Sequence, residues 1–296
     1  MSSKNIRRGI TVALVAGVAA TVPAVGSAHA APAGNWKVAK IATYGSLENL
    51  GFDGTGRMLL SADTVDTRTP SGRKGVLVTG VTSPGGISVR DGKAYYAAGN
   101  AFASGALGLR DGSIGSVDLK TGAKRTVATG LTMPNGLTAL PSGGFVVSRT
   151  LGATTGLTLV RENGTTKAIA KGLTSTNGVW WDATRKRVLT ATSANAATTV
   201  AAVNPSTGAW RTLATVPGVS ALNFADDLTT DADGNIYVAL DVAGKVLRID
   251  AATGRQHVIA QVPLVTSVRF GQGPGWDSAS LYATSLTGGL YKLTPR

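Results

Sequence analysis

Residues 225–260 read ADDLTTDADGNIYVALDVAGKVLRIDAATGRQHVIA, and this stretch decides the fold. It holds four short runs rich in apolar and β-branched residues. The turn-forming sequence DADGN at 231–235 separates the first two runs, and DAATG at 250–254 separates the last two. Short runs of this kind, bounded by Asp, Asn and Gly, predict four consecutive antiparallel strands.

The start of this unit recurs along the chain. A triplet with a small or polar first residue and an apolar third residue returns at intervals of 37–50 residues. The copies are Glu48-Asn49-Leu50, Gly85-Gly86-Ile87, Asn135-Gly136-Leu137, Asn177-Gly178-Val179, Asp226-Asp227-Leu228 and Thr266-Ser267-Val268. Strand–turn–strand hairpins also return, at 116–130 and 203–214. Six four-stranded units near this period predict an all-β fold, a six-bladed β-propeller.

The two ends of the chain complement each other. The final unit ends after its third strand, at 289–293, and so lacks a fourth. Residues 36–43 have the alternation of an outer strand. We therefore expect the N-terminal strand to pair with the last blade and close the ring, which removes exposed strand edges. The Gly- and Ala-rich stretch 99–115 and the Thr-rich stretch around Asp63 and Asp66 are expected to be loops.

Residues 1–30 have the features of a secretion signal. A basic start with Lys4, Arg7 and Arg8 precedes an apolar run, and Ala28-His29-Ala30 matches a cleavage site that ends at Ala30. We expect a secreted, extracellular protein with residues 31–296 as a single propeller domain. General secretion fits best, and the Arg7-Arg8 pair leaves a twin-arginine route open. No later stretch has the length of a membrane span.

Composition excludes several classes of function. The chain has no cysteine, so thiolate chemistry and zinc–sulfur sites are excluded. The formal net charge is +13, but the basic residues are scattered and form no stripe with aromatic residues. This pattern does not favour nucleic-acid binding. It is compatible with weak adhesion to anionic surface polymers.

Four of the six triplets begin with an oxygen-bearing side chain. Because equivalent residues of each blade converge on one mouth of a propeller channel, we expect Glu48, Asn135, Asn177 and Asp226 to lie together. The two acids supply two negative charges, which would balance one divalent cation. Calcium fits an all-oxygen set best, although magnesium, manganese or zinc would also accept it. The competing interpretation is that these are turn residues, because Asn-Gly is a common turn former.

The chain resembles the SMP-30/gluconolactonase-like family of six-bladed propellers. The resemblance rests on PNGL at 134–137, TNG at 176–178, the run 225–240 and GKVLRID at 244–250. It implies a calcium-dependent hydrolase of lactones and related esters. It also implies that Glu48, Asn177 and Asp226 hold the metal, that Asn135 is a further ligand or a substrate contact, and that Asp226 is the candidate base.

Two positions depart from the family pattern. Glu48-Asn49-Leu50 stands where many members have Glu-Gly-Pro, and Met133 stands where sugar lactonases carry an arginine that contacts substrate hydroxyls. Met133 is thus a candidate substrate-binding residue. This change favours a small lactone or ester that is more apolar than a sugar lactone.

The leading hypothesis is metal-assisted hydrolysis, in which the cation polarises the substrate carbonyl and Asp226 acts as the base. After residue 30 the one histidine is His257, on a predicted outer strand, so a Ser–His–Asp triad is disfavoured. Two alternatives stay open: a non-catalytic, ligand-binding propeller of the cell envelope with a structural metal, and a propeller enzyme of another reaction class.

Overall fold

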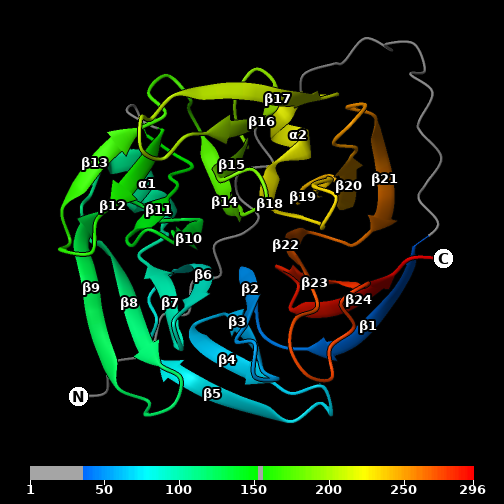
Figure 1. The fold of residues 1–296 in the computed structure, drawn as a ribbon, viewed down its shortest axis with the longest axis horizontal. Helices are drawn as coiled ribbons and strands as arrows, with labels where there is room; N and C mark the ends of the chain where they lie inside the picture. The colour runs from blue at the N-terminus through cyan, green and yellow to red at the C-terminus, as the bar shows by residue number, and fades with distance from the viewer. Residues whose placement is uncertain (1–35, 153–155) are drawn as a thin grey trace, which may run out of the picture. The chain divides into compact units, whose positions relative to one another are not determined.

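A computed structural model describes residues 36–152 and 156–296 of the chain. The predicted secretion signal at 1–30 lies outside the described residues, so it stays a prediction. Within the described residues, 24 strands form six four-stranded antiparallel sheets. Figure 1 shows these sheets arranged around a common centre, with the chain running from β1 in blue to β24 in red. The predicted six-bladed β-propeller is confirmed.

Each of the first three blades uses four consecutive strands. They are β2 (Asn49–Phe52), β3 (Met58–Ser61), β4 (Thr64–Arg68) and β5 (Lys74–Thr79) in blade 1; β6 (Pro84–Arg90), β7 (Lys93–Ala98), β8 (Gly112–Asp118) and β9 (Lys124–Leu131) in blade 2; and β10 (Leu137–Ala139), β11 (Phe145–Val147), β12 (Leu157–Val160) and β13 (Thr166–Ile169) in blade 3.

The next two blades repeat this order, and the last combines both ends of the chain. They are β14 (Thr176–Asp182), β15 (Arg187–Thr192), β16 (Thr198–Val203) and β17 (Trp210–Val216) in blade 4; β18 (Ala225–Thr230), β19 (Ile236–Leu240), β20 (Lys245–Ile249) and β21 (Gln256–Gln261) in blade 5; and β22 (Val265–Phe270), β23 (Leu281–Ser285), β24 (Gly289–Thr294) and β1 (Lys37–Thr43) in blade 6.

The predicted closure is confirmed by the register of the last sheet. Strand β1 pairs antiparallel with β24, from Lys37 opposite Thr294 to Thr43 opposite Gly289. The sheet order is therefore β1-β24-β23-β22, with the earliest strand on the outer edge of the latest blade. Trp36 extends this contact, because its ring packs 6.0 Å from the ring of Tyr237 in blade 5.

The hydrophobic core is divided into six clusters, and each cluster joins two neighbouring blades. The alternation of side chains along β19 shows how one strand contributes residues to two clusters. Val238 packs toward blade 4, while Tyr237 and Ala239 pack toward blade 6. Successive side chains of a strand point to opposite faces, so a blade needs apolar residues on both faces. Blade-to-blade packing of this kind stabilises the fold in a chain without cysteine.

Strand direction gives the ring two different faces. The first strands of all blades begin at one face, which also holds the connections between second and third strands and those between blades. We call this the site face. The turns between first and second strands, and between third and fourth strands, lie at the other face, which we call the turn face. The sequence 231–235 forms one of these turns, with Asp231 Oδ1 accepting a hydrogen bond of 2.9 Å from the backbone N–H of Asn235.

Two stretches differ from the sequence prediction. The expected loop at 99–115 contains a short helix, α1 (Phe102–Leu107), and the start of β8. Asp66, expected in a loop, lies in β4, where its side chain is half-buried. A second short helix, α2 (Ser220–Asn223), precedes β18. Neither of these helices has the length or the apolar character that crossing a bilayer would require in the part of the chain described.

Candidate active site

The triplets stand where the first strands begin, and a local irregularity aims their side chains. The pairing of first and second strands shifts at Pro84/Ile87, Thr176/Val179, Ala225/Leu228 and Val265/Ser267. Each shift falls within or beside a triplet. A β-bulge inserts an unpaired residue and redirects its neighbours, and bulges are common beside active sites. The bulges thus free the leading residues of these triplets from the regular ladder.

Glycines at the second triplet position bring neighbouring first strands into close contact. A Cβ atom on Gly178 would lie 2.5 Å from both the Asp226 carbonyl oxygen and the Asp227 Cα. Gly86 and Gly136 meet the next strand in the same way, at 2.4 Å from Leu137 N and 2.6 Å from Asn177 O. Any side chain at these positions would separate blades 2, 3, 4 and 5. The glycines therefore fix the spacing on this half of the ring.

On the other half, the second positions carry side chains that meet around Asp227. The Oδ2 atom of Asp227 accepts hydrogen bonds from Asn49 Nδ2, at 2.9 Å, and from Ser267 Oγ. It also lies 2.6 Å from NH1 of Arg269, whose guanidinium sits 4.7 Å from the ring centroid of Trp180. Asp227 and Arg269 are both buried. This ion pair with its polar partners links blades 1, 4, 5 and 6.

Three of the polar residues around the ring centre form a hydrogen-bonded chain. Asn100 Nδ2 donates to Glu48 Oε1 at 3.1 Å, and Asn135 Nδ2 donates to Asn100 Oδ1 at 3.3 Å. Glu48 is half-buried at the start of blade 1, and Asn135 is buried at the start of blade 3. Asn100, which follows the second strand of blade 2, therefore connects two of the predicted site residues.

Only the amide nitrogen of the Asn177 side chain is hydrogen-bonded. Its Nδ2 donates to Ser193 Oγ at 3.0 Å, and Ser193 Oγ donates to the Ala225 carbonyl oxygen at 2.7 Å. The Asn177 Oδ1 atom is buried and accepts no hydrogen bond from any described residue. A buried amide oxygen without a donor is costly, so it marks a place where a ligand can bind.

Asp226 belongs to a group of acids whose charges act on one another. Burial, together with the charges of Glu48, Asp241 and Asp227, raises the pKa of Asp226 well above its usual range. Burial and the charges of Asp241 and Asp227 raise the pKa of Glu48 to about 7. Burial also raises the pKa of Asp241 to about 7. Burial is the largest cause of all three pKa shifts, and the charges of neighbouring acids add to it for Asp226 and Glu48.

The composition of this cluster fits a hard cation. Asp227 is paired with Arg269, but no ion pair in the described part of the chain includes Glu48, Asp226 or Asp241. Asp241 Oδ1 is buried and, like Asn177 Oδ1, has no hydrogen-bond donor among the described residues. No group of three His, Cys, Asp or Glu side chains within 36–152 and 156–296 forms a metal cage on its own. A cation here would therefore draw on carboxylate and amide oxygens together.

Met133 lies next to this cluster in sequence but packs under α1. It is buried, with a φ of 44°, and its sulfur would lie 2.3 Å from a Cβ placed on Gly105 of that helix. Arg149 holds the other side of α1, where NH2 donates to the Gly105 carbonyl oxygen at 3.0 Å. The proposed contact of Met133 with substrate stays a prediction.

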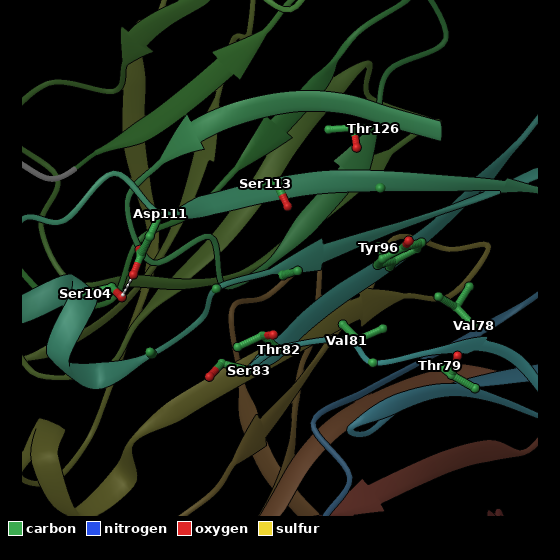
Figure 2. Close-up of a pocket in the computed structure, with 15 residues that line it drawn as sticks. Val78, Thr79, Val81, Thr82, Ser83, Tyr96, Ser104, Asp111, Ser113 and Thr126 are labelled. Carbon is green, nitrogen blue, oxygen red and sulfur yellow. Dashed lines mark hydrogen bonds between the residues drawn. The ribbon is translucent and has the colours of Figure 1, made fainter. Parts of the chain in front are cut away.

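A separate pocket of about 400 Å³ lies in blade 2 beside blade 1. Figure 2 shows Ser104 and Asp111 hydrogen-bonded at one end, at 2.8 Å, with Val78 and Thr79 at the other. Its volume is within the range of small-molecule sites. None of the predicted site residues lines it, although Gly99, which does, precedes Asn100.

Sequence reasoning missed Asn100, Asp241 and Asp227. Asn100 and Asp241 follow second strands, at Ala98 and Leu240, whereas the prediction considered only the starts of first strands. The recurring end of the second strand was an available signal for both. Asp227 was visible in its triplet, but nothing in the sequence showed that Arg269 would lie beside it.

Comparison with known proteins bears on this arrangement. A family model described as the SMP-30/Gluconolactonase/LRE-like region matches residues 148–287. The resemblance to the SMP-30/gluconolactonase-like family is confirmed. The SMP-30-like match includes Asn177 and Asp226, and it begins after Glu48, Met133 and Asn135. A curated relative, Regucalcin of Xenopus laevis, is 35% identical over 85 residues, which are 23% of this chain and 27% of that protein.

Solved structures match the chain over most of its length. A gluconolactonase of Xanthomonas campestris has a TM-score of 0.68 at 14% identity and covers 88% of this chain and 90% of its own. Virginiamycin B lyase of Staphylococcus aureus has a TM-score of 0.60 at 11% identity and covers 88% of this chain and 100% of its own. At these identities the likeness shows the fold, which hosts different reactions in these two proteins.

Proposed function

We propose that this protein is an exported hydrolase of a small lactone or related ester. We further propose that the reaction depends on a divalent cation, and that this cation is calcium. The resemblance to the gluconolactonase-like family supports a hydrolase. The oxygen-rich cluster at the site face supports the cation. The signal-like features of residues 1–30 support export.

The observation that carries the proposal is the set of acids without a cationic partner. Glu48, Asp226 and Asp241 are close enough for their charges to raise the pKa values of Asp226 and Glu48. Keeping several carboxylates ionised in a poorly solvated cluster is unfavourable unless a positive charge lies among them. Arg269 compensates only Asp227. A divalent cation would supply the missing charge.

Glu48, Asn177 and Asp226 would hold the cation, with Asn135 and Asp241 as further oxygen donors from the same cluster. The unpartnered oxygens of Asn177 and Asp241 support this assignment. When bound, the cation supplies a Lewis acid that polarises the substrate carbonyl. Asn100 holds the side chains of Glu48 and Asn135, and Ser193 holds that of Asn177.

Asp226 is the candidate base. Burial and the neighbouring acids raise its pKa in the absence of a cation. A bound cation would lower that pKa but would also make a neighbouring water more acidic, so that Asp226 could still accept a proton from this water. In the proposed reaction Asp226 takes a proton from water as the water oxygen bonds to the carbonyl carbon. The bond from that carbon to the ring oxygen then breaks, and the leaving oxygen receives the proton.

Met133 supports a proposal for the substrate class, through the family resemblance that aligns it with a substrate-contacting arginine. A buried thioether in place of a guanidinium offers dispersion contacts and no strong hydrogen-bond donor. We propose that the substrate carries fewer hydroxyl groups than a sugar lactone. Nucleic acid is not proposed as a partner.

Hydrolysis of a lactone and aryl-ester panel by chelator-treated protein, before and after calcium is added, tests the proposal. We expect turnover only with the cation, and a loss of about 100-fold or more in Asp226→Asn. Asp233→Asn, at an exposed turn-face position, should retain full activity. Cation binding without turnover of any panel member would contradict hydrolysis and favour a ligand-binding propeller.

A further inference from the structure

Apolar side chains gather on the site face. Nine large apolar side chains are exposed in the described residues. Six of them lie in site-face connections, and the remaining three, Val38, Val76 and Trp210, lie on outer strands. The site-face set is Phe102, Leu107, Leu109, Val219, Leu222 and Val242. Single exposed apolar residues are ordinary, but a gathering on one face marks an interaction surface.

Two short helices present most of this set. On α1, Leu107 is 74% exposed and Phe102 is 42% exposed, while Ser104 and Gly105 are buried against the blades. Val219 at the N-cap of α2 is 61% exposed and Leu222 within α2 is 60% exposed, while Ser220 is buried. The helices belong to the β7–β8 and β17–β18 connections, so the apolar residues occur at two separate parts of the ring.

Charged side chains are concentrated on the face opposite to the exposed apolar ones. The site-face stretches 99–109, 193–197 and 217–224 contain no charged residue. The charged side chains are concentrated in turns such as 90–93, 118–125, 182–187 and 250–255 at the turn face. Exposed apolar side chains therefore surround the acid cluster on the site face, while most charged turns lie on the turn face, an arrangement that suits a boundary between a nonpolar phase and water.

In the described residues, the site face has three exposed basic residues and two exposed acidic ones, and two of the basic residues lie beside the exposed apolar side chains. Arg110 follows Leu109, Lys245 lies three residues after Val242, and Lys171 lies in the connection from blade 3 to blade 4. Asp63 and Asp111 are the exposed acids among the described site-face residues, and Asp111 accepts a hydrogen bond from Ser104 Oγ. Apolar side chains with basic neighbours bind anionic lipid surfaces.

We propose that the site face seats on the surface of an anionic lipid aggregate, a vesicle or a micelle. An amphiphilic ester or lactone with an acyl chain would then reach the site from the lipid, without crossing water. The substrate half of this inference rests on the proposed function, whereas adsorption to lipid does not.

Sedimentation with phosphatidylglycerol vesicles and with phosphatidylcholine vesicles tests adsorption. We expect the wild-type protein to sediment with the anionic vesicles and to be released by salt. The pair Leu107→Ser and Leu222→Ser should lower the partition coefficient by about tenfold or more, because two exposed leucines lose burial in the lipid. The matched pair Val38→Ser and Val76→Ser, on outer strands and 37% and 58% exposed, should leave it unchanged. Both pairs alter exposed side chains, and their unfolding midpoints establish that they fold.

The inference is overturned if the wild-type protein stays in the supernatant, or if both variant pairs sediment as the wild type does. It is also overturned if the leucine pair abolishes self-association of the lipid-free protein, because the face would then be a contact between copies. Turnover of a short, water-soluble lactone separates the two proposals. Soluble turnover without adsorption overturns this inference alone, and adsorption without turnover of any substrate overturns the proposed function and leaves the lipid surface supported.

Discussion

At the scale of single residues, Asp227 shows how one side chain organises the centre of the ring. Three other triplets carry glycine at this position, and Asp227 instead accepts hydrogen bonds from Asn49 and Ser267 and pairs with Arg269. Its negative charge is one of those that raise the pKa values of Glu48 and Asp226. Asp227 therefore connects the packing of the blades with the electrostatics of the candidate site.

Replacing Asp227 by alanine should lower the free energy of unfolding by about 3–5 kcal/mol, because it leaves the Arg269 guanidinium buried and unpaired. Denaturant-induced unfolding measures this loss. The control is Glu162→Ala, which removes an exposed partner 3.1 Å from Arg90 and should cost less than about 1 kcal/mol. Equal losses of unfolding free energy in the two variants would mean that the buried ion pair contributes no more to stability than an exposed one.

Glu48 should make the stability of the metal-free protein depend on pH. Its pKa is about 7 in the folded protein and 4.5 ordinarily, so between these values the folded state binds more protons than the unfolded state. Stability from this group is therefore present at low pH and falls as the pH rises from 4.5 to about 7, by at most ~3 kcal/mol. Above that window the loss is complete.

The difference in unfolding free energy between wild type and Glu48→Gln, measured in chelator across this window, isolates the effect. The decline should be smaller in the variant, where Asp226 and Asp241 still contribute to it, and calcium should remove most of it from the wild type. Glu162→Gln, an exposed change, should keep the wild-type profile. A difference between wild type and Glu48→Gln that does not change with pH would contradict the assignment.

At the scale of elements, the first strands position the site through bulges and glycines. Gly178 allows β14 to lie against the backbone of Asp226 and Asp227, where a Cβ would be 2.5 Å from two backbone atoms. Replacing Gly178 by alanine should therefore cost roughly 1–3 kcal/mol and move Asp226. Unfolding and cation titration would both detect this. Gly45→Ala, where no atom lies within 4 Å of the added methyl group, is the matched control and should change neither.

The elements also show which features were readable from the sequence. Strand pairs such as β18–β19 and β20–β21 were predictable because their apolar runs and their Asp, Asn and Gly turns are local. The helices α1 and α2, of six and four residues, are too short to show helical periodicity. Strand β4 was missed because its Thr- and Asp-rich sequence resembles a loop, although Val65 is buried in the core.

At the scale of the whole molecule, repetition made both the fold and part of the site predictable. A ring places equivalent residues at one face, so the sequence repeat was enough to select Glu48, Asn135, Asn177 and Asp226. Asn100 and Asp241 follow second strands, so the repeat at the starts of first strands did not select them. The pairing of Arg269 with Asp227 and the gathering of apolar residues on the site face arise only when the blades close into a ring.

The central claim is that the cluster around Asp226 binds a divalent cation, and calorimetric titration of calcium into chelator-treated protein tests it most directly. We predict one bound calcium per chain in the wild type, unchanged binding in Asp233→Asn, and binding weakened by about 100-fold or more in Asp226→Asn, which removes a charged ligand. No heat of binding in the wild type, or equal affinity in the two variants, would contradict the account.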